Sequence, residues 1–214
     1  MQSGEIIKQR YKIMAPRIIK ALQDRNFEAY FCETAEEGAK KALSFIPEGE
    51  TVSWGGSLTI HEIGLTKLIK EGNYQVIDRD LAETEEERIK MMRQALTCHT
   101  FLSSVNAVSE DGIMINIDGM GNRIAAIAFG PESVILMVGM NKICRDRDAA
   151  VTRARTETAP ANALRLGLDL PCTNTGCCFD CSKKECTCSQ IVEMRRNRVP
   201  GRIKVILIGE AFGL

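Results

Sequence analysis

The first third of the chain alternates between two hydrophobic periods. Apolar residues three and four positions apart predict a helix over residues 6–24, and Pro16 within it predicts a kink or break near Ala15 because proline lacks an amide hydrogen. Short apolar runs then alternate with helical spacing. They predict strands at 27–32, 51–54 and 74–77, and helices at 35–45, 58–71 and 81–96.

From residue 101 onwards the hydrophobic period shortens, which is typical of strands. We predict strands at 101–108, 113–117, 124–129, 134–138 and 204–208, with hairpin turns at 111–112 and 118–122. We also predict a helix over 146–166, with Pro160 beginning its second part, and a short helix around 190–196. Strands that alternate with helices indicate an α/β fold with a mixed sheet flanked by helices.

The composition describes a folded protein of ordinary size. The chain has 214 residues, of which 44% are hydrophobic and 26% charged, and this excludes general disorder. We expect a single domain over 1–214, with a cysteine-rich metal-binding segment at 171–189. Equal numbers of basic and acidic residues, 28 each, argue against nucleic-acid binding through bulk charge.

The hydropathy pattern also bears on location. No apolar run reaches about 18 residues, so we predict no membrane span. The first 20 residues lack the apolar centre and cleavage site of a secretion signal. We therefore expect a cytoplasmic protein.

A glycine-rich turn joins the strand at 51–54 to the next helix. Gly55 and Gly56 let a ligand approach the backbone closely, and the start of a helix offers free N–H groups to an anion. Ser57 and Thr59 add hydroxyl donors. The turn is either a site for a phosphate, carboxylate or nucleotide, or a tight turn whose hydroxyl caps the helix.

The first turn of that helix also holds His61 and Glu62, a candidate acid–base pair. Thr59 and Glu62, however, have the spacing of a capping box. We therefore interpret Glu62 as structural.

A second candidate for anion binding is the two-glycine turn that ends in Asn122 and Arg123. It is either a plain turn or a loop whose last two side chains face a pocket and bind an anionic group. Between Lys142 and Lys204 basic residues outnumber acidic ones. This excess suits a small anionic partner, or shields a negatively charged cluster.

Six of the nine cysteines lie between Cys172 and Cys188. In a cytosolic chain such a cluster indicates metal binding or redox chemistry rather than a disulfide framework. Four thiolates satisfy either one iron–sulfur cluster or a tetrahedral zinc ion. A C-x-x-C pair and its two flanking residues give the predicted metal ligands: Cys172, Cys178, Cys181 and Cys188. Cys177 and Cys186 are then spare, and a thiol–disulfide switch or simple burial remain alternatives.

Four sequence runs resemble the LUD-domain family, which includes the C subunit of bacterial lactate-utilisation systems. They are WGGSLTIHEIG from residue 54, DGMGNR from 118, VGMNK from 138 and PCTNTGCCFDC from 171. The resemblance covers nearly the whole chain, and the tail resembles a stand-alone branch with four cysteines, to which Cys177 and Cys186 are extra. It implies a fold similar to that of the phosphosugar isomerases and CoA transferases, in which a glycine–serine turn binds phosphate or an acyl-CoA group. The catalytic residues of those enzymes have no match here.

These observations give one leading expectation and two alternatives. We expect a redox-associated protein that carries an iron–sulfur cluster of the 4Fe–4S type. Together with a redox partner protein, it would support oxidation of lactate or a similar small organic acid. The alternatives are a stand-alone enzyme acting on a phosphorylated or CoA-linked small molecule, with structural zinc, and a ligand-sensing module. Self-association is left open. We also expect the cysteine segment to lie near Gly55, because ligands collect at the carboxyl ends of strands in open α/β sheets.

Overall fold

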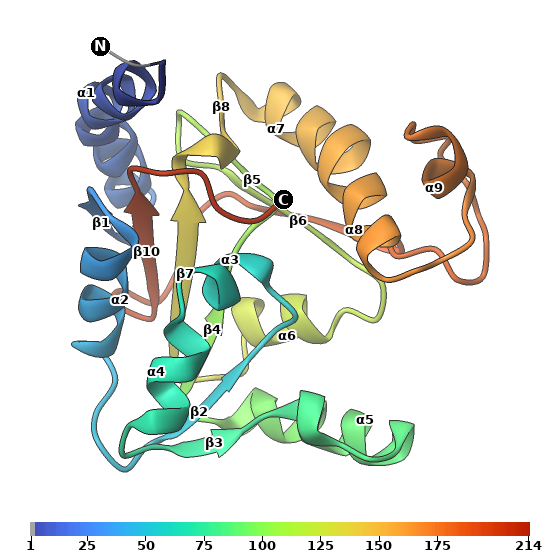
Figure 1. The fold of residues 1–214 in the computed structure, drawn as a ribbon. Coiled ribbons are helices and arrows are strands. Elements are labelled where there is room, and N and C mark those ends of the chain that lie inside the picture. The colour runs from blue at the N-terminus through green and yellow to red at the C-terminus, as the bar shows by residue number, and fades with distance from the viewer. Residues whose placement is uncertain (1–2) are drawn as a thin grey trace.

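The computed structural model describes residues 3–214, so the first two residues of the expected domain lie outside the described part. Two sheets form the framework (Figure 1). The larger sheet has six parallel strands in the order β1 (Glu28–Cys32), β10 (Ile203–Ile208), β7 (Ser133–Gly139), β4 (Thr100–Ser103), β2 (Thr51–Trp54) and β3 (Gln75–Ile77). The smaller, mixed sheet has the order β8 (Ile143–Cys144), β5 (Ala107–Ser109), β6 (Met114–Asp118) and β9 (Gln190–Met194). The expected α/β class is confirmed.

Helices cover both faces of the parallel sheet, as its hydrophobic strands require. One face packs against α1 (Ser3–Asp24) and α6 (Asn122–Ala128), and the other against α2 (Ala35–Leu43), α3 (Leu58–Glu62) and α4 (Leu65–Glu71). Alternate residues of β7 serve the two cores: Leu136 packs with the first group and Ile135 with the second. At the lower edge in Figure 1 lie the short η1 (Arg79–Leu81), α5 (Glu85–Gln94) and η2 (Ala95–Thr97).

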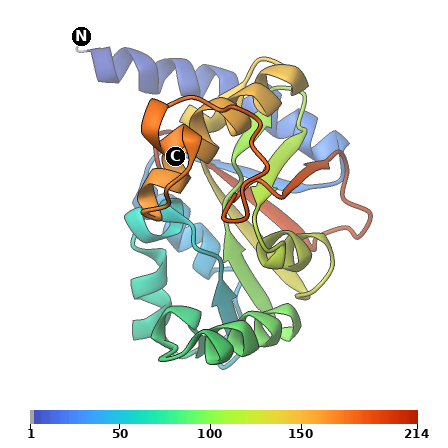
Figure 2. The same cartoon turned by 90° about the vertical axis from the view of Figure 1, so that its right-hand side faces the viewer.

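The smaller sheet has its own helical cover. It consists of α7 (Arg147–Arg153), the π-helical turn η4 (Ala154–Thr158) and α8 (Ala159–Arg165). Small side chains of this cover, including Ala150 and Ala154, pack against Ala107 and Ile115 of the sheet. The short α9 (Pro171–Thr175) lies beside α8, and a loop leads from it to β9 (Figure 2). Pro160 begins α8, as predicted.

Two predicted elements have the wrong type. The segment 124–129, predicted as a strand, belongs to helix α6, because Gly121 turns the chain at φ 80° and Ala126 and Ile127 pack onto the parallel sheet. The segment 190–196, predicted as a helix, contains strand β9, because residues 190–194 pair antiparallel with β6. The turn at 118–122 is consequently a strand-to-helix loop and not a hairpin.

Other boundaries differ in detail. Helix α1 continues through Pro16, so the predicted break is wrong. The predicted helix at 58–71 is divided by Gly64, which has φ 78°, and the predicted strand at 101–108 is interrupted between β4 and β5. This interruption carries Ser104 and Asn106 into a cavity. Among residues 3–214, no helix combines the length and the apolar character that crossing a membrane requires.

Candidate functional site: a basic cavity beside a cluster of thiols

A cavity of about 280 Å³ lies where the parallel strands end. Residues that follow four different strands line it: Gly56 after β2, Arg79 after β3, Ser104 after β4 and Lys142 after β7. Residues from the smaller sheet and from α8 close its other side. This is the edge at which open α/β sheets bind their ligands. We call it the basic cavity, because four cationic side chains line it: Arg79, Arg123, Lys142 and Arg165.

The structure brings the predicted anion-binding residues together. The residues that line the basic cavity include Gly56, Ser57, Thr59, Asn122 and Arg123. Gly55 lies behind them, and a methyl group at its Cα would stand 3.4 Å from Cγ of Arg123. The arginine side chain therefore packs against the turn at ordinary contact distance. Whether these residues bind a ligand stays a prediction.

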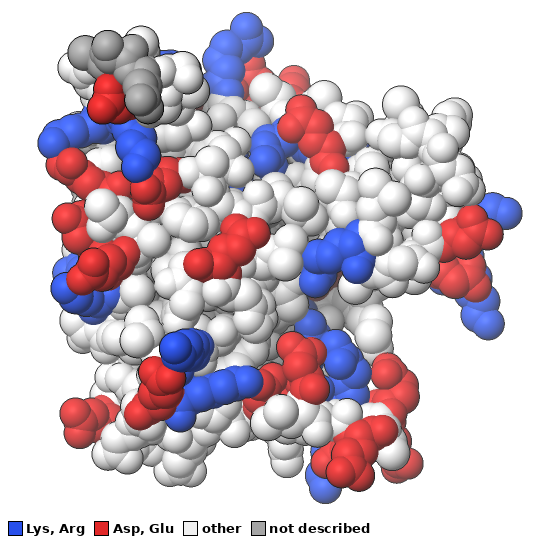
Figure 3. Space-filling model, in the orientation of Figure 1, with Lys and Arg blue, Asp and Glu red and all other residues white. Residues whose placement is uncertain are grey.

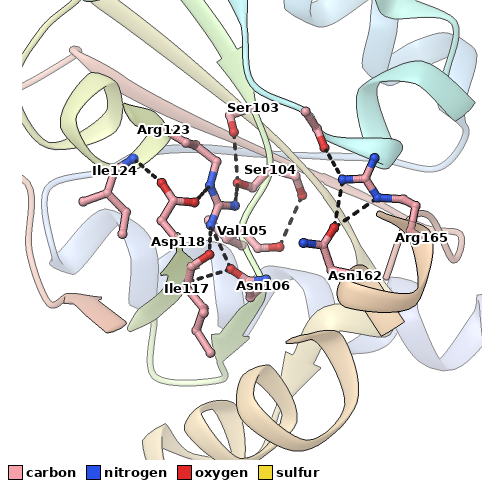
Figure 4. Close-up of polar contacts among 11 residues, drawn as sticks. Ser103, Ser104, Val105, Asn106, Ile117, Asp118, Arg123, Ile124, Asn162 and Arg165 are labelled. Carbon is pink, nitrogen blue, oxygen red and sulfur yellow. Dashed lines mark hydrogen bonds and ion pairs between the residues drawn. The ribbon is translucent and has the colours of Figure 1, made fainter. Parts of the chain in front are cut away.

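Arg123 is largely committed to holding the cavity wall together (Figure 4). Its guanidinium donates to Asp118 Oδ1 at 3.0 Å, to Asn106 Oδ1 at 3.0 Å, and to the carbonyls of Ser104 and Ile117 at 3.3 and 2.8 Å. These four bonds use most of the five N–H donors of an arginine. Arg123 thus ties the loop after β4 to the end of β6, and little of its donor capacity faces a ligand.

Arg79 and Arg165 are less committed. Hydrogen-bond acceptors for Arg165 are the neutral Asn162 Oδ1, at 2.8 and 3.0 Å, and the Gly56 carbonyl at 3.4 Å. A methyl group on Gly56 would lie 2.8 Å from Arg79 Nη2 and 3.9 Å from Arg165 Nη2, so both guanidiniums converge there. Burial, before other influences, lowers the pKa of Arg79. The nearest carboxylate to Arg79, that of Asp80, is 3.9 Å from its Nε, beyond hydrogen-bond distance, and Asp80 does not line the cavity. Two cations that meet in this way form a binding place for an anion.

Two buried polar atoms support that interpretation. Nε of Arg79 and Oγ of Ser57 have no hydrogen-bond partner among residues 3–214. Buried polar atoms are nearly always paired, because an unpaired one costs about 1–3 kcal/mol. Both residues line the basic cavity, and a bound anion would supply the missing acceptor.

Lys142 lies at the floor of the same cavity and is only 4% exposed. Its Nζ donates to Thr59 Oγ1 at 2.9 Å, Ser104 Oγ at 3.0 Å and the Val105 carbonyl at 3.2 Å. Burial lowers its pKa to about 7, and the nearby charges of two arginines, Arg153 and Arg123, act in the same direction, while Glu62 opposes them. An amine whose pKa is lowered this far is partly neutral near pH 7 and is available for chemistry that an ordinary lysine cannot perform.

The capping box predicted for Thr59 and Glu62 is wrong. The helix begins after Ser57, whose side chain makes no capping bond. Thr59 instead accepts the hydrogen bond from Lys142, and Glu62 Oε2 accepts one from the backbone N–H of Gly213 at 2.6 Å. Because α3 has only five residues, side chains rather than a helix dipole provide the positive charge of the site.

A second, smaller cavity of about 60 Å³ lies beside α8. Five thiol side chains line it, and we call it the thiol cavity: Cys172, Cys178, Cys181, Cys186 and Cys188. All four predicted metal ligands are among them. The two cysteines interpreted as spare are separated, since Cys186 lines the cavity whereas Cys177 is exposed outside it.

The thiols are close enough to influence one another. Burial and the neighbouring Cys186 raise the pKa of Cys188 to about 11. Burial, followed by three nearby thiols, also raises the pKa of Cys172. The part of the chain that the structure describes nevertheless holds no group of three His, Cys, Asp or Glu side chains already arranged to hold a metal ion. Thiolates are strong ligands for zinc and iron–sulfur clusters, so the donor set suits either once the thiols converge.

Thr187 connects the two cavities. It lies between Cys186 and Cys188 in the sequence and lines both the basic and the thiol cavity. A methyl group on Gly119, in the loop that leads to Arg123, would lie 3.5 Å from the Cα of Thr187. The cysteine segment therefore packs at the same end of the molecule as the glycine turn, as we expected.

Sequence reasoning missed the three cations that distinguish the site: Arg79, Lys142 and Arg165. Arg79 and Lys142 each follow a correctly predicted strand, at 74–77 and 134–138 respectively. Polar residues directly after a parallel strand were therefore a usable signal. Arg165 gives no such signal, because it is one of several arginines on a predicted helix.

The architecture and the site define an α/β protein with a basic cavity at the strand ends and a neighbouring thiol cluster. The chain belongs to the LUD domain family, whose pattern it matches over residues 15–208, and that family is associated with lactate utilisation. A comparison with curated proteins finds no match.

One solved structure confirms the fold. A DUF162 family protein from Deinococcus radiodurans aligns with a TM-score of 0.54 over 92% of this chain and 98% of its own, at 12% identity. Ribose 5-phosphate isomerase from Plasmodium falciparum aligns with a TM-score of 0.32 over 50% of this chain and 51% of its own, at 13% identity.

Proposed function

We propose that this LUD-domain protein binds lactate or a similar small organic anion in the basic cavity and carries an iron–sulfur cluster at the thiol cavity, in support of oxidation of that acid. One observation carries the proposal: Thr187 is part of the wall of both cavities. A redox group held by the thiols would stand directly beside an anion held by the arginines.

Each cavity has the donors that its ligand needs. Arg79 and Arg165 supply bidentate N–H donors of the kind that carboxylates prefer. Four of the five thiols would hold the cluster, which supplies one-electron transfer when bound. A redox partner protein would then exchange electrons at the rim of the thiol cavity, where Phe179 is 61% exposed.

Anaerobic purification tests the cluster. The protein is expected to contain iron and acid-labile sulfide and to absorb visible light, and Cys178→Ser is expected to lose most of all three. Cys144→Ser is the matched control, because Cys144 lies outside residues 171–189 and outside the thiol cavity. Stoichiometric zinc without sulfide would indicate a structural zinc site in place of the cluster. Absence of both iron and zinc contradicts metal binding altogether.

A second candidate function is supported by the charge of the basic cavity. The convergence of Arg79 and Arg165 on Gly56 suits a phosphate as well as a carboxylate. We therefore keep, as the alternative, an enzyme or ligand-sensing module that acts on a phosphorylated or CoA-linked small molecule, with structural zinc at the thiols. Calorimetric titration with lactate and with a phosphate ester of similar size separates the two, since the tighter ligand identifies the charged group.

A further inference from the structure

The basic cavity places an amine and an anion clamp on the two ends of one short turn. Gly56 lies at the guanidiniums of Arg79 and Arg165, and Thr59 accepts the hydrogen bond from Lys142 Nζ at 2.9 Å. Only Ser57 and Leu58 lie between Gly56 and Thr59, so the Cα atoms of Gly56 and Thr59 are at most about 11 Å apart. Arg79, Arg165 and Lys142 line one cavity of about 280 Å³, which has room for a molecule with a few carbon atoms.

The hydrogen bonds of Lys142 suit both of its protonation states. Two of its partners, Thr59 and Ser104, are hydroxyl groups, which can donate as well as accept. The ammonium form donates to both hydroxyls and to the Val105 carbonyl, while the neutral amine donates to the carbonyl and one hydroxyl and accepts from the other. Neither form leaves a partner unsatisfied, so the amine loses a proton without disrupting the site.

The charges around Lys142 also favour its neutral form. Arg123 on α6 and Arg153 on α7 face it, and Glu62 on α3 is the one acidic group that acts on it in the opposite sense. A neutral amine in a cavity that binds anions is a nucleophile toward a carbonyl carbon.

We propose that Lys142 forms an imine with a small anionic carbonyl compound, whose charged group Arg79 and Arg165 hold. This inference rests on the proposed function, in which the basic cavity binds an organic anion, and it names the substrate class more narrowly. The neutral amine adds its lone pair to the carbonyl carbon, and a proton moves from nitrogen to oxygen to give a carbinolamine. Loss of one water molecule then leaves the carbon–nitrogen double bond, and Ser104 and Thr59 lie where they can hydrogen-bond the departing oxygen.

Reductive trapping tests the proposal on the full chain. The protein is incubated with cyanoborohydride and either pyruvate, a 2-oxo carboxylate, or dihydroxyacetone phosphate, a keto phosphate. Hydride addition fixes the imine as a secondary amine, so the protein mass is expected to rise by that of the ligand less one oxygen atom. Peptide mapping is expected to find the label on Lys142, whichever probe reacts, and the reactive probe identifies the anionic group.

Lys204 provides the matched control. It is another lysine whose pKa is lowered by burial, but it donates to Ser133 and Gly201 outside the basic cavity. Labelling is expected to disappear in Lys142→Arg and to persist in Lys204→Arg. At pH 7 the wild-type site is expected to react on the order of 1000-fold faster than exposed lysines, because an ordinary lysine is almost entirely protonated there.

The outcomes are separable. If calorimetry detects binding of either probe but neither labels Lys142 above the other lysines, the imine is refuted while anion binding stands. If neither probe nor lactate nor inorganic phosphate binds, the proposed function fails as well. Should Lys142→Arg misfold, labelling of the wild-type protein in the presence of excess phosphate replaces it, and label on Lys142 that phosphate does not reduce contradicts the proposal.

Discussion

The two cavities are built on different physical principles. The basic cavity lies at the ends of strands from both sheets, and a single arginine, Arg123, fixes the loop after β4 to the end of β6 through four hydrogen bonds. The thiol cavity is formed mostly by residues 171–189, a segment with little regular structure. The first is therefore organised before a ligand arrives, whereas the second gathers suitable donors that its ligand must still draw together.

Surface charge sharpens the contrast. The face shown in Figure 3 carries basic and acidic side chains interspersed, with no broad patch of one sign. The positive charge that matters is inside the basic cavity, where Arg79, Arg165 and Lys142 outnumber acidic groups. Selectivity for anions is thus expected to come from short-range contacts rather than from the field of the whole molecule.

The largest expected effect comes from removing the clamp of the basic cavity. Arg79→Gln combined with Arg165→Gln is expected to lower the affinity for lactate or phosphate on the order of 100-fold, because two charge-assisted contacts are lost. Isothermal titration calorimetry measures it. Arg145→Gln is the control, since Arg145 is an exposed arginine that pairs with Asp146 at 2.8 Å and does not line the cavity. Unchanged affinity in the double variant would place the anion elsewhere.

Gly56→Val tests the same clamp through its shape. The new Cβ would meet Nη2 of Arg79 at 2.8 Å, and this flexible side chain can move away without unfolding the protein. We expect roughly tenfold weaker anion binding, equivalent to one displaced charged contact, with a nearly unchanged melting temperature. Binding equal to wild type, together with intact circular dichroism, argues against a ligand at this turn.

The pH dependence of stability tests the burial of Lys142. Its pKa is about 7 in the folded protein and near its ordinary value of 10.5 when unfolded, so between these values the unfolded chain binds more protons. Stability therefore rises with pH across this window, by at most about 1.4 kcal/mol per pH unit. Urea unfolding at pH 7, 8 and 9 is expected to show this slope in wild type but not in Lys142→Met. Parallel slopes would mean that Lys142 keeps an ordinary pKa.

The smallest expected effect distinguishes Cys186, which lines the thiol cavity, from Cys177, which lies outside it. Cys186→Ser is expected to reduce metal retention during dialysis several-fold, because Cys186 lines the cavity and its Sγ accepts the backbone N–H of Cys188 at 3.4 Å. Cys177→Ser is expected to leave retention unchanged, because Cys177 is exposed. Equal losses in both variants would show that the segment rearranges around its metal.

The two cavities differed in how far the sequence could predict them. The thiol cavity was predictable because its six candidate cysteines lie within 17 consecutive residues, and such a cluster is evident from the sequence alone. The basic cavity depends on Arg79 and Lys142 meeting at one sheet edge, and only the strand order brings them together. The glycine turn at Gly55 was readable because glycines and hydroxyls followed a predicted strand directly.

The errors in the fold have a common physical cause. The run 124–129 is short and almost entirely apolar, and periodicity cannot separate a buried strand from a short buried helix in such a run. Residues 190–194 mix three apolar residues with two polar ones in no regular alternation, and their strand conformation comes from pairing with β6, a contact between distant parts of the chain. Local pattern does not contain that information.

Thr187 has a thermodynamic consequence. If filling the thiol cavity shifts this residue and thereby changes the affinity of the basic cavity, then filling the basic cavity must change the affinity of the thiols by the same factor. A coupling free energy of this kind acts equally on both cavities. An anion that binds more tightly to the metal-loaded protein would, by the same amount, slow the loss of the metal, so the supply of small molecule would help to decide how much of the protein stays loaded.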